Sequence, residues 1–439
     1  MPACPRKRRK QIIHRRTRTT DHKVGNIIGM AEAAEAHSIV IAGGGICGLA
    51  TALALHRKGI ASLVLEKSRS LRADGAGIGV HANGWRVLEQ LGVAADLRDT
   101  AHLITVYHDV WKQGDKISRE KVPVRTELRC LNRKDLIEAL AKDIPAGTIR
   151  FGCRIAAVDA DPAGGHGAVL TMADGTTIKA KVLIGCEGTY SVVAKYLGLS
   201  PVRTIPRPVL RGFTWYPHGH SFDNEFLRLR VGDFFIGRLT ITDNLVHFFI
   251  TMPKPPTADV STKDLKQVRD HALKEMRDVQ CPAEIIDIVR DSDPESLNFV
   301  TEFWYRPPWE VVLGSFQKGT VTVAGDAMHA MGPFIGQGGS AGLEDAVVLA
   351  RSLARAVGDA DGVGKGAAPA RREKMVGEAI GEYIRERRPR VALLSLESFI
   401  MGTLLVRSPS PVTKLACVAV LVLLGSKSLR HAYYDCGRL

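Results

Sequence analysis

The chain has 439 residues, of which 45% are hydrophobic and 24% are charged, as is usual for a globular protein with a sizeable core. Its formal net charge is +14, but residues 1–30 alone hold nine Lys and Arg against one acid, so the rest is only mildly basic. This distribution argues against a nucleic-acid-binding protein, and no nucleic-acid partner is expected.

The eight cysteines are scattered, without a C-x-x-C pair or a cluster at zinc spacing. We therefore expect reduced thiols in an intracellular compartment and no metal site. Residues 1–37 are predicted to be a basic disordered leader, because no apolar segment of a secretory signal follows the basic residues. A nuclear-type basic cluster, an organelle transit peptide and sequence upstream of a start at Met30 all stay open, as does the choice between cytoplasm and plastid.

A glycine motif follows the first predicted strand. Residues 38–42 form a short apolar run typical of a buried strand, and G-x-G-x-x-G comes directly after it at Gly43, Gly45 and Gly48. In a dinucleotide site the first glycine allows a tight turn, the second lets the backbone approach a pyrophosphate, and the third lets helix and strand pack closely. The helix that follows ends near Gly59, and its N-terminus offers free N–H groups to phosphates.

Glu66 ends the second predicted strand, at residues 60–65, and lies 18 residues after Gly48. This is close to the spacing of about 20 residues expected for a carboxylate that binds ribose. Because no second G-x-G-x-x-G follows a strand, we expect one committed dinucleotide site. The motif itself does not say which dinucleotide is bound.

Two features of the next segment could contact the same ligand. Residues 75–79 form a second glycine cluster, which is either a loop beside a cofactor ring or a plain turn between strand and helix. Residues 132–142 predict a helix capped by Asn132, with Arg133 in its first turn. The helix dipole disfavours a cation there, so Arg133 indicates a nearby anion unless it is simply an exposed surface residue.

The pattern changes after an apolar strand predicted at residues 182–186, which runs into Glu187-Gly188 and Ser191. Alternating segments over residues 201–251 predict the antiparallel sheet of a second domain. A sheet face needs aromatic residues in any case. Four residues there could line a pocket floor: Arg211, Trp215, Tyr216 and His218.

A further apolar strand is predicted at residues 320–324 and ends in Gly325-Asp326. A glycine-rich loop, Pro333 to Gly339, follows, and then a long helix over residues 340–357. We expect a structural role for His329, close to this anchor, rather than acid or base catalysis.

Helices are also predicted after a Gly- and Ala-rich linker at residues 358–369. The charge run Arg385 to Arg390 is expected on a solvated helix face. Residues 415–424 are ten apolar residues in a row, whereas a bilayer span needs about 20. A buried helix, or at most an interfacial one, is predicted there.

The order of these anchors resembles that of the single-component FAD-dependent aromatic hydroxylases, typified by p-hydroxybenzoate and salicylate hydroxylases. The anchors are the G-x-G-x-x-G with Glu66, then Glu187-Gly188-x-x-Ser191, then Gly325-Asp326 with the loop after it. Within the family the chain is most similar to the plant monooxygenase branch, related to zeaxanthin epoxidase and urate hydroxylase. The closing residues 435–439 resemble the tail of that branch, and the resemblance covers residues 38–439.

The resemblance implies roles for named residues. Glu66 would bind the ribose of the FAD adenosine, Arg133 would lie near the pyrophosphate, and Asp326 would hydrogen-bond the ribityl chain. The helix from Ser340 would point its positive end at the flavin's pyrimidine edge. The loop before it would lie against the isoalloxazine ring, through Pro333, Gly336, Gly338 and Gly339.

The resemblance also implies a reaction cycle. NADH or NADPH, as a transient reductant, would reduce the FAD, and O2 would form a hydroperoxide at flavin C4a that hydroxylates a small-molecule substrate. The protein would exclude water, so that the hydroperoxide does not decay to H2O2. One motif departs from the family pattern, since Glu187 stands where Asp is usual and Ala194 is followed by Lys195 where Arg is expected. Nicotinamide affinity is the property that this departure affects most.

The expected fold is therefore α/β, with a Rossmann-like three-layer FAD-binding domain and an inserted antiparallel-sheet substrate domain. The FAD domain would comprise residues 38–200 and 300–357, the substrate domain residues 201–299, and the linker with C-terminal helices residues 358–439. The expected function is an FAD- and NAD(P)H-dependent monooxygenase acting on a small aromatic or ring-containing compound. A flavin oxidase or epoxidase on the same scaffold, and a flavin-binding protein that works through partners, are the alternatives. Neither the substrate, nor a catalytic side chain, nor the oligomeric state is predicted.

Overall fold

The computed structural model describes residues 35–71, 76–162, 167–256, 260–362, 369–406, 410–424 and 431–439. Residues 1–34 of the leader predicted over residues 1–37 lie outside these ranges. Residues 35–37 already belong to the first strand, which begins three residues earlier than the sequence pattern indicates.

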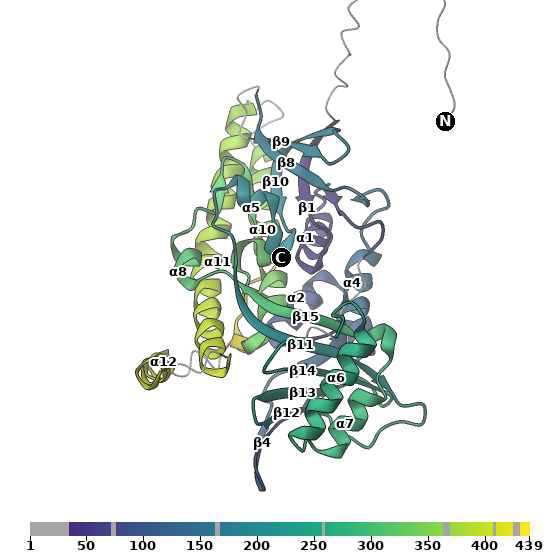
Figure 1. Cartoon of the computed structure of the whole chain (residues 1–439). Helices are drawn as coiled ribbons and strands as arrows, with labels where there is room; N and C mark the ends of the chain where they lie inside the picture. The colour runs from purple at the N-terminus through teal and green to yellow at the C-terminus, as the bar shows by residue number, and fades with distance from the viewer. Residues whose placement is uncertain are drawn as a thin grey trace, which may run out of the picture. The chain divides into compact units, whose positions relative to one another are not determined.

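A largely parallel sheet forms the first half of the fold (Figure 1). Strands β17, β10, β1, β2 and β7 run parallel in this order, β16 closes one edge antiparallel, and β9 and β8 extend β10 antiparallel. The strands are β1 (Glu35–Ala42), β2 (Leu63–Leu65), β7 (Ile149–Arg150), β8 (Ile155–Ala160), β9 (Ala168–Met172), β10 (Thr177–Gly185), β16 (Gln317–Lys318) and β17 (Val321–Val323).

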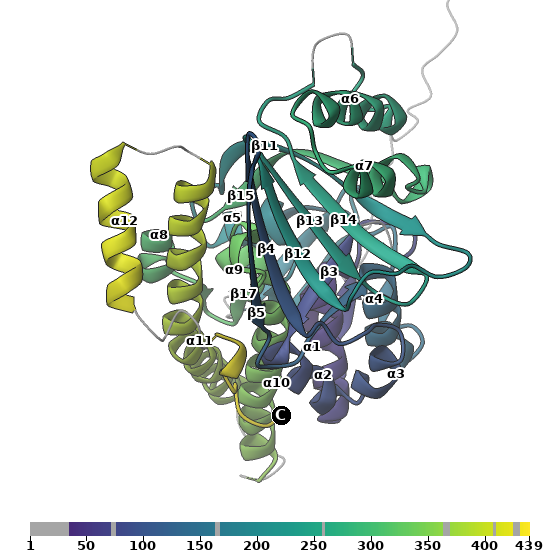
Figure 2. The same cartoon turned by 90° about the horizontal axis from the view of Figure 1, so that it is seen from below.

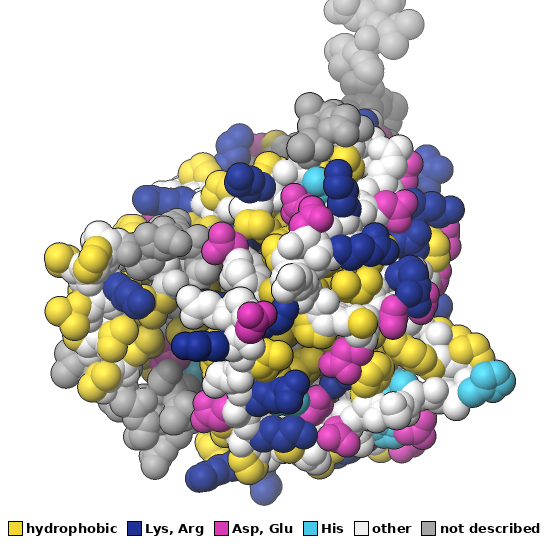
Figure 3. All heavy atoms as spheres, turned by 60° about the horizontal axis from the view of Figure 1, so that its bottom comes forward, with side chains coloured by type: hydrophobic (Ala, Val, Ile, Leu, Met, Phe, Trp, Pro, Cys, Tyr) yellow, Lys and Arg dark blue, Asp and Glu magenta, His cyan; other side chains and the backbone are white. Residues whose placement is uncertain are grey.

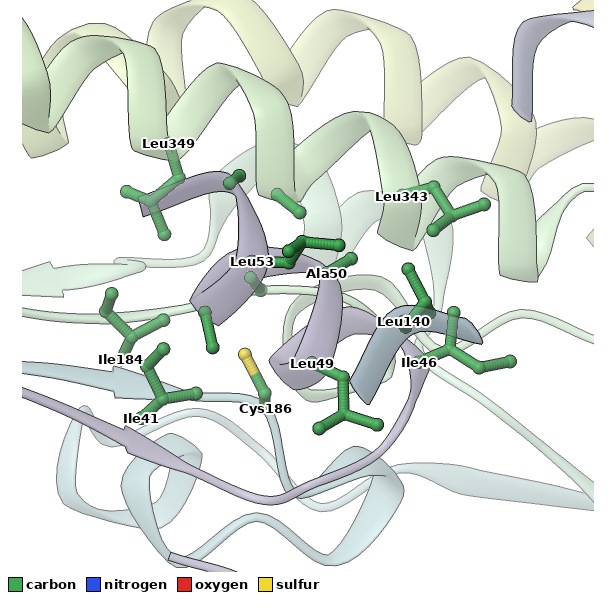
Figure 4. Close-up of a cluster of buried hydrophobic side chains, with 14 of the residues drawn as sticks. Ile41, Ile46, Leu49, Ala50, Leu53, Leu140, Ile184, Cys186, Leu343 and Leu349 are labelled. Carbon is green, nitrogen blue, oxygen red and sulfur yellow. The ribbon is translucent and has the colours of Figure 1, made fainter. Parts of the chain in front are cut away.

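Helix α1 (Ile46–Arg57) lies between this sheet and helix α10 (Gly338–Gly362). Figure 4 shows its side chains, among them Leu49 and Leu53, between Ile41 and Ile184 of the strands and apolar side chains of α10. All four of these residues are fully buried. Helix α1 is apolar on nearly every side, so it can bury one side against the strands and the other against α10. The other helices of this half are α2 (Ala82–Leu91), α3 (Ala94–Arg98), α4 (Arg133–Lys142), α5 (Val192–Tyr196) and α9 (Asp326–His329).

A seven-stranded sheet forms the second half, in the order β15-β11-β14-β13-β12-β4-β5 (Figure 2). Its strands are β4 (Val106–Gln113), β5 (Lys116–Pro123), β11 (Arg203–Trp215), β12 (Glu225–Val231), β13 (Phe234–Thr240), β14 (Leu245–Thr251) and β15 (Asn298–Tyr305). Helices α6 (Leu265–Asp278) and α7 (Ala283–Arg290) cover one face and share a core with it. The sheet is antiparallel except for β4, which pairs parallel with β12 and comes from the first half of the chain.

A two-stranded sheet of β3 (Gly77–His81) and β6 (Leu128–Asn132) lies outside both large sheets. The glycine cluster at residues 75–79 therefore enters a strand from Gly77 onward, while residues 72–75 lie outside the described range. Short 3-10 helices complete this part: η1 (Gly188–Tyr190), η2 (Pro294–Ser296) and η3 (Pro333–Ile335).

The C-terminal part consists of α8 (Pro308–Leu313), the long α11 (Pro369–Val406) and α12 (Pro411–Leu424). Two expectations for it are wrong. The charge run at residues 385–390 does not lie on a solvated face throughout, since Arg387 and Arg390 are buried. The apolar run at residues 415–424 belongs to α12, most of whose described side chains are exposed, so a buried helix is wrong and the interfacial alternative stays a prediction.

The helix predicted at residues 340–357 begins earlier and ends later, at Gly338 and Gly362, and takes up the start of the predicted linker. Linker residues 363–368 lie outside the described range. Across the described ranges, no helix combines the length and the apolar character that crossing a bilayer requires.

Candidate functional site

Four of the motifs singled out in the sequence meet at one edge of the parallel sheet. The turn at Gly43 follows β1, Glu66 follows β2, Glu187 follows β10, and Gly325 follows β17. The strands of a parallel sheet bring their carboxyl ends to the same edge. After β1 the chain adds β2 on one side of that strand, and it later adds β10 and β17 on the other side, so the strand order reverses at β1. Ligands of open α/β sheets bind at such a position.

The glycine motif has the geometry that a pyrophosphate needs. Gly43 has a φ of +98°, and a Cβ there would lie 2.6 Å from the carbonyl oxygen of Cys186. A Cβ on Gly48 would lie 1.9 Å from the carbonyl oxygen of Gly43. Gly45 differs, because no described atom outside its immediate chain neighbours comes within 4 Å of its Cβ position. Two glycines are thus required by packing, and Gly45 borders open space.

That open space faces the N-terminus of α1. Gly45 is the N-cap residue, and within the described chain no side chain caps the helix and no acid occupies its first turn. The N–H groups there retain their capacity to bind an anion, and the helix dipole favours one. A dinucleotide pyrophosphate therefore fits this position.

Glu66 lies beside the same turn and is 3% exposed. One of its carboxylate oxygens accepts the Gly44 N–H at 2.7 Å, and the other accepts the Ser68 N–H at 2.9 Å. These bonds orient the carboxylate beside the turn, where it can accept hydrogen bonds from hydroxyl groups.

Asp326 is exposed at the first position of α9, next to the start of α1. The preceding Gly325 has a φ of +61°, and a Cβ there would lie 3.0 Å from Cys47 Cβ. Gly325 N–H donates to Asp345 Oδ2 at 2.9 Å. The turn that presents Asp326 is thus fixed from both sides, with its carboxylate outside the core.

The loop from Pro333 to Gly339 lies against β3. Gly336 has a φ of +63°, and its Cβ position is 3.3 Å from His81 Nε2. A Cβ on Gly339 would lie 2.8 Å from Ile78. Gly338 begins α10, so the positive end of a long helix opens at this loop.

Arg133 is the first residue of α4, directly after Asn132, whose side chain accepts the Lys134 N–H at 3.0 Å. Asn132 is therefore the helix cap that the sequence predicts. It pairs with Gly77 of β3, which brings Arg133 beside the strand that contacts the glycine loop. Burial lowers the pKa of Arg211 below its ordinary value, and the neighbouring charge of Arg133 lowers it further.

The two faces of the seven-stranded sheet differ, and we call the face that does not contact α6 and α7 the inner face. On it, Phe226 and Phe235 both pack against Phe249, with ring centroids 6.2 and 5.8 Å apart, and all three are half-buried. His247, two residues before Phe249 on β14, lies on the same face, and a Cβ on Gly77 of β3 would lie 2.7 Å from its ring. The inner face therefore meets β3, the strand against which the glycine loop lies.

Among the four pocket-floor candidates, Arg211 has the position closest to this junction. It is half-buried on β11, donates to Asn298 Oδ1 at 2.8 Å, and shares a face with Phe249. Trp215, at the end of the strand, is 58% exposed. Tyr216 contacts the His220 ring edge to face beyond the end of the strand.

The side chain of Glu187, one methylene longer than that of Asp, forms its hydrogen bonds within the protein. Its carboxylate accepts the Ser191 hydroxyl at 2.5 Å and the Val192 N–H at 3.0 Å, so it binds the N-terminus of α5, whose N-cap residue is Ser191. Burial raises the pKa of Glu187, although these bonds partly offset the effect. The longer acid therefore stabilises a helix terminus.

A buried network of charges lies behind the site, and the sequence reasoning missed it. Asp345 Oδ2 bonds His329 Nε2 at 2.6 Å, and Asp345 Oδ1 accepts from Arg387 Nε at 2.7 Å. Arg387 also pairs with Glu344, which pairs in turn with Arg390. Two adjacent acids in the otherwise uncharged first half of α10 were the available signal. His329 is fully buried here, in agreement with a structural role.

This network links the site to the end of the chain. Glu344 Oε1 accepts from Asn83 Nδ2 at 2.6 Å, and Asn83 Nδ2 also donates to Gln337 in the glycine loop. Arg390 bonds His431 at 3.1 Å. The last residues continue onto α2 and α10, where Arg351 donates to the Cys436 carbonyl at 2.7 Å. The network therefore connects the glycine loop, α10, α11 and the tail.

A profile of the FAD-binding domain matches residues 36–380. The chain belongs to this FAD-binding domain family of monooxygenases. The α/β fold class, the FAD cofactor and the enzyme class expected from the sequence are thereby confirmed. The uncapped α1 terminus, the open space at Gly45 and the exposed carboxylate of Asp326 fit this cofactor.

Named relatives agree with the family. Monooxygenase 1 of Arabidopsis thaliana is 45% identical over 403 residues, which are 91% of this chain and 99% of that protein. The FAD-dependent urate hydroxylase of Mycolicibacterium vanbaalenii is 29% identical over 71% of this chain and 78% of its own length. The crystal structure of Klebsiella pneumoniae HpxO complexed with FAD and uric acid matches the fold with a TM-score of 0.68 at 19% identity, covering 91% of this chain and 94% of that one.

Proposed function

We propose that this monooxygenase uses NADH or NADPH and O2 to hydroxylate a small aromatic or ring-containing compound between the flavin and the inner face. The observation that carries the proposal is the group of half-buried rings Phe226, Phe235 and Phe249 on the face that contacts β3, beside the glycine loop. Half-buried aromatic side chains offer apolar contact to a planar ligand. A relative named for urate and a fold neighbour crystallised with uric acid support a ring-shaped substrate.

We assign the cofactor contacts by the same reasoning. Glu66 binds the adenosine ribose, Arg133 lies near the pyrophosphate, and Asp326 bonds the ribityl chain. The support is that Glu66 and Asp326 follow strands at one sheet edge, while Arg133 flanks β3. The pyrophosphate turn and the ring-facing loop supply the remaining contacts, through Gly43, Gly45, Gly48, Pro333, Gly336, Gly338 and Gly339.

When bound, FAD takes electrons from the nicotinamide and supplies the oxygen-activating chemistry. The protein's own part is binding, orientation and exclusion of water. The N-terminus of α10 at Gly338 stabilises negative charge on the pyrimidine edge of the ring. A single glycine motif fits a nicotinamide that binds only transiently.

We further propose that Arg211 binds an anionic group of the substrate. It donates a hydrogen bond to the neutral amide of Asn298, and its neighbour Arg133 is also a cation. A half-buried guanidinium in such surroundings is stabilised by a carboxylate or an ionised ring oxygen. The compartment, cytoplasmic or plastid, stays a prediction from the sequence.

The test is anaerobic reduction of the purified holoprotein by NADH and by NADPH, followed through flavin absorbance. The panel pairs aromatic carboxylates, phenols and uric acid with neutral amide or methyl-ether counterparts. We expect an anionic ring compound to accelerate reduction more than its neutral counterpart does. Flavin that neither nicotinamide reduces would contradict the proposal in favour of an oxidase or a flavin-binding protein.

The variant Arg211→Met tests separately whether Arg211 binds the anionic group of the substrate. It should raise the half-saturating concentration of the anionic compound at least tenfold, since a charge-assisted hydrogen bond contributes about 1.5–3 kcal/mol. The neutral counterpart should be unaffected. Arg290→Met is the matched control, because Arg290 is exposed on α7 and pairs with Asp287 on the covered face of the sheet. An equal effect in both variants would contradict a role for Arg211.

A further inference from the structure

Helix α12 presents apolar side chains to solvent along its whole described length. Val412 is 78% exposed, Leu415 71% and Val422 72%, and Val418 adds 43%. The positions 412, 415, 419 and 422 follow helical spacing and form one stripe, whose remaining member is Ala419. Solvated apolar side chains on a continuous stripe indicate a surface that binds something.

The opposite side of α12 is apolar too. Cys417, Val420 and Leu421 are half-buried toward the protein, and α12 contacts α11. A helix of 14 residues is about 21 Å long, whereas the hydrocarbon core of a bilayer is about 30 Å thick. The helix thus carries more apolar side chains than its contact with the protein buries, and it is too short to cross a bilayer.

The sequence around α12 carries charge of one sign. Between Glu397 and Asp435 there is no acidic residue, while four cations occur there: Arg407, Lys414, Lys427 and Arg430. Of these, Lys414 lies within α12 and is exposed. Cations flanking an apolar segment are attracted to anionic lipid head groups.

Helix α8 adds a second apolar element on the same side. Trp309 is 47% exposed, Val312 49% and Leu313 80%. Both α8 and α12 contact α11, and both lie to its left in Figures 1 and 2. Arg203 stacks over the Trp309 ring at 5.6 Å. Trp beside a cation is typical of side chains at the depth of lipid head groups.

Figure 3 shows hydrophobic side chains gathered at the left of the view, where α12 lies in Figure 1. We propose that α12 and α8 attach this enzyme to the surface of a membrane that contains anionic lipid, without crossing it. The stripe enters the outer hydrocarbon layer, and Lys414 stays among the head groups.

A second copy of the chain suits this surface less well. In a two-fold dimer the same patch would meet itself, which brings the Lys414 side chains of both copies to one interface. Like charges across an interface are unfavourable, and within the described α12 there is no acid to offset them. An anionic lipid surface, in contrast, complements both the apolar stripe and the charge.

The test is co-sedimentation of the full-length holoprotein with vesicles of phosphatidylcholine alone or of an equimolar mixture with phosphatidylglycerol. We expect binding to the mixed vesicles, and binding that weakens at high salt. The double variant Leu415→Glu/Val422→Glu should lower the bound fraction at least tenfold, since both side chains are exposed and their burial drives attachment. Lys414→Glu should lower binding to the mixed vesicles with little effect on the weak binding to phosphatidylcholine.

The matched control is Ile117→Glu/Val122→Glu on the edge strand β5, where both side chains are also exposed apolar residues. Its binding should equal that of the unchanged protein. Light scattering with size-exclusion chromatography runs in parallel without vesicles. No vesicle binding, equal loss in the control, or a dimer that Leu415→Glu/Val422→Glu dissociates would overturn the proposal.

Discussion

Asp345 and Arg387 form an ion pair inside the protein, with Oδ1 2.7 Å from Nε and neither side chain exposed. Burial alone raises the pKa of Asp345, but His329 and Arg387 bring it well below its ordinary value. Because Asp345 also accepts the Gly325 N–H, this pair fixes the turn that presents Asp326. The connection between α10 and α11 is therefore a connection to the cofactor site as well.

Arg387→Met should lower the free energy of unfolding by about 3–5 kcal/mol, because it leaves Glu344 and Asp345 buried with fewer cations. Urea unfolding of the apoprotein at neutral pH measures this change. Arg290→Met removes an exposed ion pair and should leave the midpoint unchanged. Equal midpoints for both variants would show that the buried pair does not stabilise the fold.

Gly45→Val should abolish FAD retention and leave the folded apoprotein intact. Its side chain would occupy the open space at the N-terminus of α1, while the extended backbone of Gly45 suits a β-branched residue. Gly48→Ala should instead lower the unfolding midpoint, because its Cβ would lie 1.9 Å from the Gly43 carbonyl oxygen. Flavin absorbance and urea unfolding of both variants check this contrast, and a fully flavin-loaded Gly45→Val protein would refute it.

Asp326→Ala should abolish stable FAD retention as well. The carboxylate is exposed, so the apoprotein should keep its stability to within about 1 kcal/mol, the size of a favourable helix-dipole interaction. Flavin content after gel filtration is the measurement. Asp278→Ala, at the exposed end of α6, is the control that should retain flavin. Normal flavin content in Asp326→Ala would remove Asp326 from the site.

Glu187→Asp should destabilise the protein by about 1 kcal/mol and leave the KM for NADH and NADPH unchanged. The shorter side chain loses its reach to Ser191 Oγ and Val192 N, and with it the hydrogen bonds that hold the N-cap residue Ser191 and the first N–H of α5. Urea unfolding and steady-state kinetics check the two halves. A changed KM with unchanged stability would instead make Glu187 part of the nicotinamide site.

Acidification should destabilise the fold through His247. Burial lowers the pKa of His247 to about 4, whereas the unfolded imidazole titrates near 6.5. The unfolded state therefore binds more protons between these values, so the contribution of His247 is complete above pH 6.5 and is lost as pH falls toward 4. The loss is about 3 kcal/mol. Urea unfolding from pH 7 to 5 should show a smaller decrease for His247→Phe, and equal decreases would exclude His247 as the cause.

The sequence could place the motifs of the cofactor edge after strands because its signals there are local, while their contacts with the cofactor stay a prediction. Packing requires Gly43 and Gly48, and Gly45 borders open space, while Glu66 and Asp326 stand shortly after apolar strands. The family implied that these segments meet, and the parallel order of the strands accounts for it.

Other features depend on partners distant in sequence. The sequence pattern assigns Arg387 and Arg390 to a solvated charge run, because the acids that they bind lie on a helix more than forty residues earlier. Likewise, β4 pairs with β12 across more than a hundred residues, so residues 106–123 could not be assigned to the second sheet by local pattern. The proposed domain boundaries at residues 200 and 300 remain a proposal for the same reason.

The measurement that tests the central claim most directly is turnover under 18O2 with the compound that most accelerates flavin reduction. The product is analysed by mass spectrometry, and H2O2 is quantified against the NAD(P)H consumed. The account predicts one 18O atom in the product and little H2O2. An unlabelled product with H2O2 equal to the NAD(P)H consumed would contradict it and make the protein an oxidase.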